Sequence, residues 1–186
     1  MPTEKEKMLQ GAPYRVFDPE LKLERRKARK LLSRFNNTKD RQSKKRQKIL
    51  KKLVGRMGEN VSITPPFYCD YGYNISLGDQ VYFNTGCIIM DVMPVTIGSN
   101  FLCGPRVQLL TASHPMDAVE RSSGKAIGKP ITIGDQVWVG AGSIICPGVT
   151  IGSRTVIGAG SVVTKNIPSD CVAAGNPCKV IRMSEQ

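Results

Sequence analysis

Residues 133–162 contain five consecutive copies of a six-residue pattern: IGDQVW, VGAGSI, ICPGVT, IGSRTV and IGAGSV. Each copy begins with a branched aliphatic residue, usually continues with glycine, and carries a small or β-branched residue at its fifth position. Two residues are inserted between the copies at 89 and 97, and earlier copies begin at Leu77, Phe83, Ile89, Ile97, Cys103 and Leu109. Five copies without a slip are improbable by chance, so this repeat decides the fold class.

A period of six fits neither a helix nor a simple alternating strand, and it predicts a mainly β solenoid. Each copy forms one short flat face, and the leading aliphatic side chains point inward and stack from coil to coil. Cys69 and Cys87 lie 18 residues apart; if three copies complete one coil, these two residues are stacked neighbours. The six cysteines form no CxxC pair, so we expect reduced, mostly buried thiols rather than disulfides.

The first third of the chain differs from the repeats in charge. The 186 residues carry a formal net charge of +12, and residues 1–60 hold 19 Lys and Arg against 7 Asp and Glu. Residues 61–186 hold eight of each, so the whole imbalance precedes residue 61. We therefore divide the chain into a basic helical segment, 1–60, and a solenoid, 61–186. The basic segment suggests nucleic-acid binding, but the sequence contains no nucleic-acid module, and a solvated surface is the simpler interpretation.

Three helices are expected in the basic segment. Thr3 and Glu6 have the spacing of a capping box, and Gly11 ends that short helix. Asp18 before Pro19 marks a second start, and one face of this helix carries the apolar residues Leu21, Ala28, Leu31, Leu32 and Phe35. Asn36 and Asn37 end it. A third helix is expected from about residue 40 to residue 54.

The stretch from His114 to Pro130 interrupts the repeat and predicts a loop that leaves the solenoid, which is a frequent place for function. His114, the only histidine, stands at the start of this loop, where an imidazole suits a general base acting on a hydroxyl. A surface residue without a catalytic role is the alternative. One histidine cannot supply a three-histidine zinc site, and we expect no metal.

The C-terminal end of the chain combines a glycine-containing segment with cations. Thr164 and Lys165 follow the last repeat, and Lys179 and Arg182 follow the segment AAGNPC at 173–178. A capping segment with solvated charges is one interpretation. The other is an anion site for a phosphorylated cofactor, because glycine permits close approach and cations meet phosphates.

Several segments together resemble the sugar O-acetyltransferases of the hexapeptide-repeat superfamily, most closely the maltose acetyltransferase branch and more distantly the galactoside and nodulation acetyltransferases. The resemblance covers almost the whole chain, and its segments are TEKEKM at 3–8, CDYGYNI at 69–75, TASHP at 111–115, GKPITIG at 128–134, VWVG at 137–140 and GNP at 175–177. It implies a left-handed parallel β-helix, a homotrimer with acetyl-CoA sites between subunits, and acetyl transfer to a sugar such as maltose or glucose.

The resemblance also implies residue roles. His114 would deprotonate the acceptor hydroxyl, Asn84 would lie beside the acceptor, and Asp70 and Asp91 would lie near the acceptor pocket. Ala141 and Ala159 would contact the pantetheine arm of acetyl-CoA. Its nucleotide end would meet Thr164, Lys165, Lys179 and Arg182. Trp138 would either line the acetyl-CoA site or support it by packing behind it.

Two other functions stay open at this point. The same scaffold could acetylate a different small acceptor, such as an amino acid or an antibiotic hydroxyl. Alternatively, the basic helices could make a non-enzymatic RNA-binding or interaction protein. The sequence contains no run of eighteen apolar residues and no secretory signal, which predicts a cytoplasmic protein without a membrane span.

Overall fold

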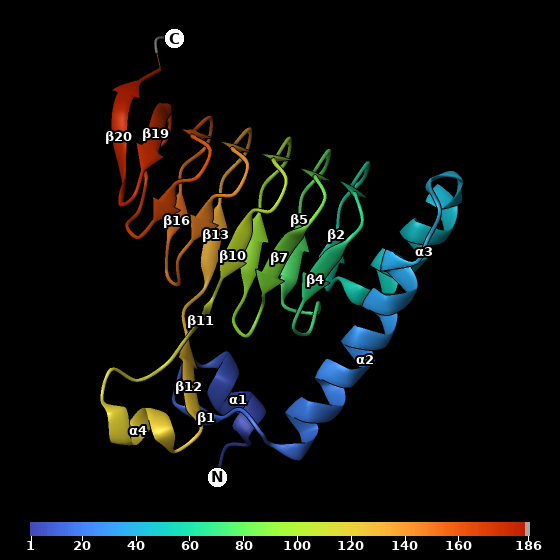
Figure 1. Ribbon diagram of the computed structural model, residues 1–186, viewed down its shortest axis with the longest axis vertical. Helices are drawn as coiled ribbons and strands as arrows, with labels where there is room; N and C mark the ends of the chain where they lie inside the picture. The colour runs from blue at the N-terminus through green and yellow to red at the C-terminus, as the bar shows by residue number, and fades with distance from the viewer. Residues whose placement is uncertain (185–186) are drawn as a thin grey trace.

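The computed structural model describes residues 1–184 and consists of a parallel β-solenoid, two helices at its first coil and a small lobe at its side (Figure 1). Three sheets form the faces of the solenoid. One face consists of β2 (Arg56–Met57), β5 (Ile75–Leu77), β8 (Val95–Ile97), β13 (Ile131–Ile133) and β16 (Thr150–Ile151). The second consists of β4 (Phe67–Cys69), β7 (Cys87–Met90), β10 (Gln108–Leu110), β15 (Ile144–Ile145) and β18 (Val162–Val163). The third consists of β3 (Ser62–Ile63), β6 (Tyr82–Phe83), β9 (Leu102–Cys103), β14 (Trp138–Val139), β17 (Val156–Ile157), β19 (Cys171–Gly175) and β20 (Cys178–Met183).

The leading residues of the repeats form the core of the solenoid, as the period of six predicts. Ile133, Val139, Ile145, Ile151 and Ile157 are all fully buried or nearly so. The last strands, β19 and β20, pair antiparallel, so a hairpin closes the stack at its C-terminal end. The mainly β solenoid is therefore confirmed.

The coils are not all 18 residues long, and the expected stacking of Cys69 on Cys87 is wrong. Cys87 pairs with Phe67, and Cys69 pairs with Ile89, a step of 20 residues. Later coils do follow the shorter step, since Thr132 pairs with Thr150. The early coils are longer because an eight-residue step, as from residue 89 to residue 97, replaces one six-residue step. Within residues 1–184 all six cysteines are free.

The turns between faces repeat a backbone conformation that side chains rarely adopt. Asn60, Gln80 and Asn100 have φ of 55°, 55° and 58°, and later coils repeat this at Gln136 and Arg154. A positive φ reverses the chain within few residues. Successive turns therefore superpose, which keeps the faces flat.

Helices continue the core beyond the first coil. The chain begins with α1 (Glu4–Leu9), α2 (Pro19–Asn36), a 3-10 turn (Asp40–Gln42) and α3 (Ser43–Leu53). The capping box at Thr3 and the cap of α2 by Asp18 are confirmed. Phe35 of α2 and Leu50 of α3 belong to the same buried cluster as the solenoid residues. The first solenoid strand, β2, begins at Arg56, so the solenoid starts before residue 61.

The interruption of the repeat is a folded lobe rather than a bare loop. The strands β11 (Ala112–Ser113) and β12 (Lys125–Gly128) pair antiparallel around α4 (Ala118–Ser122). The N-terminal strand β1 (Tyr14–Arg15) adds to β12 as a third strand. A second buried cluster fills the lobe and includes Met8, Tyr14, Leu21, Tyr71 and Ala126. In Figure 1 the lobe lies beside the N-terminal part of α2. No described helix is both long and apolar enough to cross a membrane.

Candidate active site

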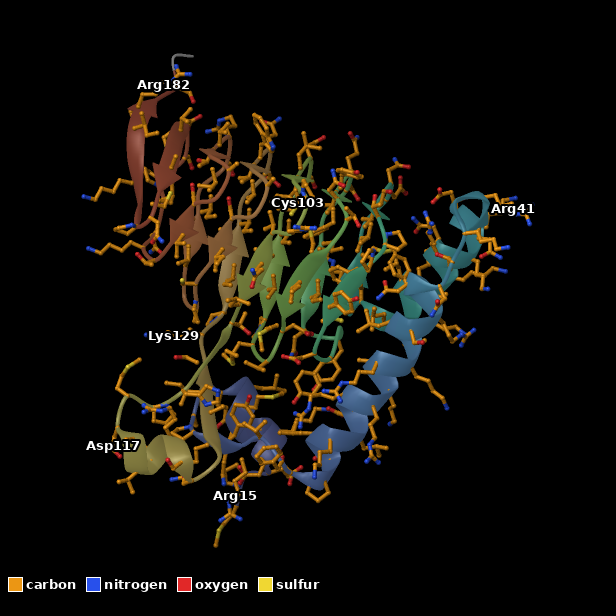
Figure 2. The ribbon with its side chains drawn as sticks, viewed as in Figure 1. Arg15, Arg41, Cys103, Asp117, Lys129 and Arg182 are labelled. Atoms are coloured by element: carbon orange, nitrogen blue, oxygen red, sulfur yellow. The ribbon has the colours of Figure 1, made fainter. Side chains whose placement is uncertain are left out.

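A cavity of about 410 Å³ lies where the lobe, α2 and the solenoid meet, a size suited to a small ligand. Figure 2 shows side chains between α2 and the lobe that carries Arg15 and Asp117. The cavity is lined by Tyr14, Val16, Phe17, Lys22, Arg25, Arg26, Arg29, Asp70, Tyr71, Met90, Val92, Ala112, His114 and Ala126. Its walls thus come from five separated parts of the sequence.

His114 is exposed at this cavity and is fixed by the hairpin of the lobe. It directly follows β11, whose Ser113 pairs with Ile127 of β12. Its Nδ1 lies 3.2 Å from the carbonyl oxygen of Lys125. A carbonyl oxygen only accepts, so Nδ1 carries the proton and donates this hydrogen bond. In the neutral ring Nε2 then carries the lone pair, which is the form that a general base requires.

Asp70, which the resemblance places near the acceptor pocket, lines the same cavity as His114. It follows β4 and is half-buried. Burial raises the pKa of its carboxyl group, and the nearby charges of Arg25 and Arg29 lower it. Tyr14 lines the same cavity, and burial raises the pKa of its phenol to about 12. The phenol therefore stays protonated at neutral pH and can donate a hydrogen bond.

Asp91 was expected near the lining of an acceptor pocket, but it lies behind the cavity wall and is fully buried. Its carboxylate accepts hydrogen bonds from three consecutive backbone N–H groups, those of Asp70 at 3.0 Å, Tyr71 at 2.9 Å and Gly72 at 2.6 Å. A tight turn leaves such donors without strand partners, and a buried donor needs an acceptor. Asp91 therefore positions the turn that places Asp70 and Tyr71 in the cavity.

Asn84 is not among the residues that line this cavity. It follows β6 on the solenoid and is half-buried. Its Oδ1 accepts a hydrogen bond from the backbone N–H of Thr85 at 2.8 Å. The amide nitrogen is the part of this side chain left to meet another molecule.

The residues expected at a cofactor lie on the solenoid, away from the His114 cavity. Trp138 is exposed and pairs with Val156, which in turn pairs with Val172, and Val172 pairs with Arg182. Trp138 and Arg182 thus share one row across four strands, about 14 Å in all at the usual strand spacing. Figure 2 shows Arg182 on the C-terminal hairpin of the solenoid, on the opposite side of the molecule from Arg15 and Asp117 in the lobe.

Two turns on adjacent coils expose the remaining expected cofactor residues. The exposed Ala141 and Ala159 stack, since the N–H of Gly160 donates to the carbonyl oxygen of Ala141 at 2.8 Å. A Cβ added to Gly142 or Gly160 would meet nothing within 4 Å, so this backbone is open to approach. Thr164, Lys165 and Lys179 are also exposed. None of the residues expected at the cofactor lines the His114 cavity.

Sequence reasoning missed the cationic wall of the cavity, which α2 supplies through Lys22, Arg25, Arg26 and Arg29. Arg25 is held in place, because its guanidinium donates to the hydroxyl of Tyr71 and to the carbonyl oxygen of Val16. The spacing of the four cations along the predicted helix was visible in the sequence. The cavity wall that faces these cations was not visible in the sequence, since it comes from segments far apart in the chain.

Comparison with known proteins places the chain among acetyltransferases. The maltose acetyltransferase hexapeptide capping motif matches residues 7–58, and the bacterial transferase hexapeptide, six repeats, matches residues 130–165. Nodulation protein L of Rhizobium meliloti is 45% identical over 96% of this chain and 97% of its own length. A maltose O-acetyltransferase from Clostridium difficile superposes with a TM-score of 0.97 at 48% identity, covering 100% of this chain and 99% of the other.

A galactoside acetyltransferase, solved in complex with coenzyme A, superposes with a TM-score of 0.96 at 40% identity, covering 100% of this chain and 92% of the other. The two family models fall on the two parts that the sequence separates, namely the basic helical segment and the repeats. The relatives match nearly the whole chain, so the likeness includes the lobe and its cavity. The chain belongs to the sugar O-acetyltransferase family of hexapeptide-repeat transferases, and it is an acetyltransferase.

Proposed function

We propose that the protein transfers the acetyl group of acetyl-CoA to a hydroxyl of a sugar such as maltose or glucose, with His114 as general base. The observation that carries this proposal is the placement of His114 at a cavity of suitable size. A hydrogen bond from Nδ1 to the carbonyl oxygen of Lys125 orients the ring and leaves Nε2 free. The likeness to a maltose O-acetyltransferase and to a galactoside acetyltransferase bound to coenzyme A supports the two substrates.

The reaction requires one proton to move twice. Nε2 of His114 accepts the proton of the acceptor hydroxyl while its oxygen forms a bond to the acetyl carbonyl carbon. The carbon–sulfur bond of the thioester then breaks, and His114 returns the proton to the leaving sulfur as a thiol. Asp70 and the phenol of Tyr14 are placed to hold the other sugar hydroxyls, because both face the same cavity.

The protein is proposed to act as a homotrimer with its active sites between subunits. In one chain, the His114 cavity lies apart from the residues assigned to the cofactor. In this proposal Asn84 lies beside the acceptor across the interface. Acetyl-CoA is bound by Trp138, Ala141, Ala159, Thr164, Lys165, Lys179 and Arg182.

The proposal is tested by substituting His114 with Ala. We expect the rate of thiol release from acetyl-CoA with maltose or glucose to fall by about 10²- to 10⁴-fold, the usual effect of removing a general base. The measurement is a thiol assay with mass spectrometry of the acetylated product. Lys44→Gln on α3 is the matched control, since Lys44 is exposed and lies outside the cavity.

The acceptor panel should also include amino acids, hydroxylated antibiotics and RNA. Unchanged turnover by the His114→Ala protein would contradict the assigned base. Selective acetylation of a non-sugar would replace the sugar in the proposal, and salt-dependent RNA binding without any turnover would replace the enzyme.

A further inference from the structure

We propose that the acceptor sugar carries an anionic group, a carboxylate or a phosphate, which Arg26 and Arg29 of α2 bind at the wall of the cavity opposite the lobe. This inference rests on the proposed function and deepens it, because it names the class of acceptor. It predicts that maltose and glucose are weaker acceptors than acidic sugars of similar size.

The first observation is the imbalance of charge in the cavity. Lys22, Arg25, Arg26 and Arg29 all line it, and Asp70 is the only carboxylate that does so among the described residues. The four cations stand at positions i, i+3, i+4 and i+7 of one helix, which places them on one face. A cavity with such a wall attracts anions and disfavours cations.

The second observation is that two of these cations lack a partner. Arg25 is bound to Tyr71 and Val16, and the ammonium of Lys22 lies 5.8 Å from the centre of the Phe17 ring. Arg26 and Arg29 take part in none of the ion pairs found within residues 1–184. Both are exposed, so their donors are available to a ligand.

Nearby acidic residues do not neutralise this wall. Glu24, the acidic residue next to Arg25, does not line the cavity. Its carboxylate forms an ion pair with Lys5 at 2.5 Å and accepts a hydrogen bond from the hydroxyl of Tyr73 at 2.7 Å. Burial raises the pKa of Asp70, and the positive charges of Arg25 and Arg29 oppose that rise, so Asp70 lies near both cations. One carboxylate facing several guanidinium groups leaves a net positive site.

The third observation is the arrangement of the cavity walls. The cations come from α2, whereas His114 comes from the hairpin β11–β12, and the two elements flank the space between them (Figure 1). A guanidinium binds a carboxylate or a phosphate through two parallel hydrogen bonds, which fixes orientation as well as position. An anionic group held at α2 therefore directs the opposite end of a small sugar toward Nε2 of His114.

The test compares glucose, glucuronate and glucose 6-phosphate, which share a ring and differ at one carbon. We expect KM to be about tenfold lower for the better of the two anionic sugars than for glucose at low salt, as a charge-assisted contact implies. Added salt should reduce this difference, because it screens exposed charges. The better of the two anions distinguishes a carboxylate site from a phosphate site.

The variant Arg26→Gln should reduce the ratio of the glucose KM to the anionic-sugar KM by about threefold, and Arg29→Gln should act in the same direction. Lys30→Gln is the matched control, since Lys30 is an exposed cation of α2 that does not line the cavity. A change in that ratio is a readout that general destabilisation of α2 would not produce. An equal or lower KM for glucose in the native protein, or an unchanged ratio in Arg26→Gln, would overturn the inference.

Calorimetric titration of glucuronate and glucose separates this inference from the proposed function. If neutral sugars are acetylated in a His114-dependent way without preference for acidic ones, the inference fails and the function stands. If no sugar is acetylated but glucuronate binds more tightly than glucose through Arg26, the function fails and the anionic site stands.

Discussion

Asp91 shows how a buried carboxyl group can serve a site that it does not touch. Its side chain is fully buried, yet it accepts hydrogen bonds from the backbone of residues 70–72. Burial raises the pKa of Asp91 to about 7. The hydrogen bonds from the backbone N–H groups of Tyr71 and Gly72 partly oppose this rise, and the negative charge of Asp70 adds to it. The group is therefore expected to titrate near neutral pH.

This titration predicts a pH dependence of stability. The folded pKa lies above the usual value, so the folded state binds the proton more tightly than the unfolded state. The contribution of Asp91 to the free energy of unfolding should therefore decline as the pH rises from about 4 to about 7, by an amount on the order of a few kcal/mol at most. Urea unfolding of the native protein and of Asp91→Asn at pH 5 and pH 8 measures it.

The comparison uses the difference between the two proteins at each pH, so that any constant effect of the substitution cancels. The native protein should lose more stability than Asp91→Asn between pH 5 and pH 8. Parallel changes in both would mean that Asp91 keeps an ordinary pKa in the folded protein.

At this scale, the sequence indicated some residues and not others. His114 stood out because it is the only histidine and begins the interruption of the repeat. Asp91 was expected near the acceptor pocket, but its role was missed, because a sequence cannot show whether a carboxylate faces a cavity or the backbone behind it. Arg26 was visible only as one charge among many.

Among the elements, β6 connects the coils through aromatic rings that pack at tilted angles. Phe83 is fully buried, and its ring centre lies 6.2 Å from that of Phe67 and 5.3 Å from that of Phe101. Phe83→Ala should lower the free energy of unfolding by about 3–5 kcal/mol, because it removes a ring and leaves a cavity in a close-packed core. Chemical denaturation followed by circular dichroism measures this loss.

Phe17→Ala is the control, since Phe17 is 70% exposed, and it should change stability by less than about 1 kcal/mol. Similar losses for both variants would show that the contacts among these three rings are not a main source of stability.

The elements also show where sequence patterns suffice. The period of six predicted the stack because every sixth side chain must point inward, and the caps at Thr3 and Asp18 predicted two helix starts. The pairing of Cys69 with Ile89 was missed, because a repeat shows which residues point inward but not how each longer turn shifts the register.

For the whole molecule, the proposed assembly gives a direct prediction. Light scattering should give a mass three times the 20.4 kDa of the chain. Because the cavity and the proposed cofactor residues lie apart in one chain, activity should fall on dilution below the concentration at which trimers dissociate. A fully active monomer would contradict sites shared between subunits.

The walls of the cavity could not be predicted from the sequence. The cavity joins residues of α2 and the segment before it, the first coils and the lobe, and only the folded chain brings these together. The net charge of the basic segment had suggested a solvated surface. Four of its cations, three of them exposed, also line the cavity that holds His114.

The lobe leaves the solenoid without disturbing it. Thr96 pairs with Thr132 across the departure in the same way that Thr132 pairs with Thr150 on the next coil. The pairing of these strands therefore does not depend on the length or composition of the segment between residues 110 and 131. Evolution can accordingly exchange the segment that carries His114 as a module, and under the proposed function new acceptor preferences can arise by descent while the scaffold stays intact.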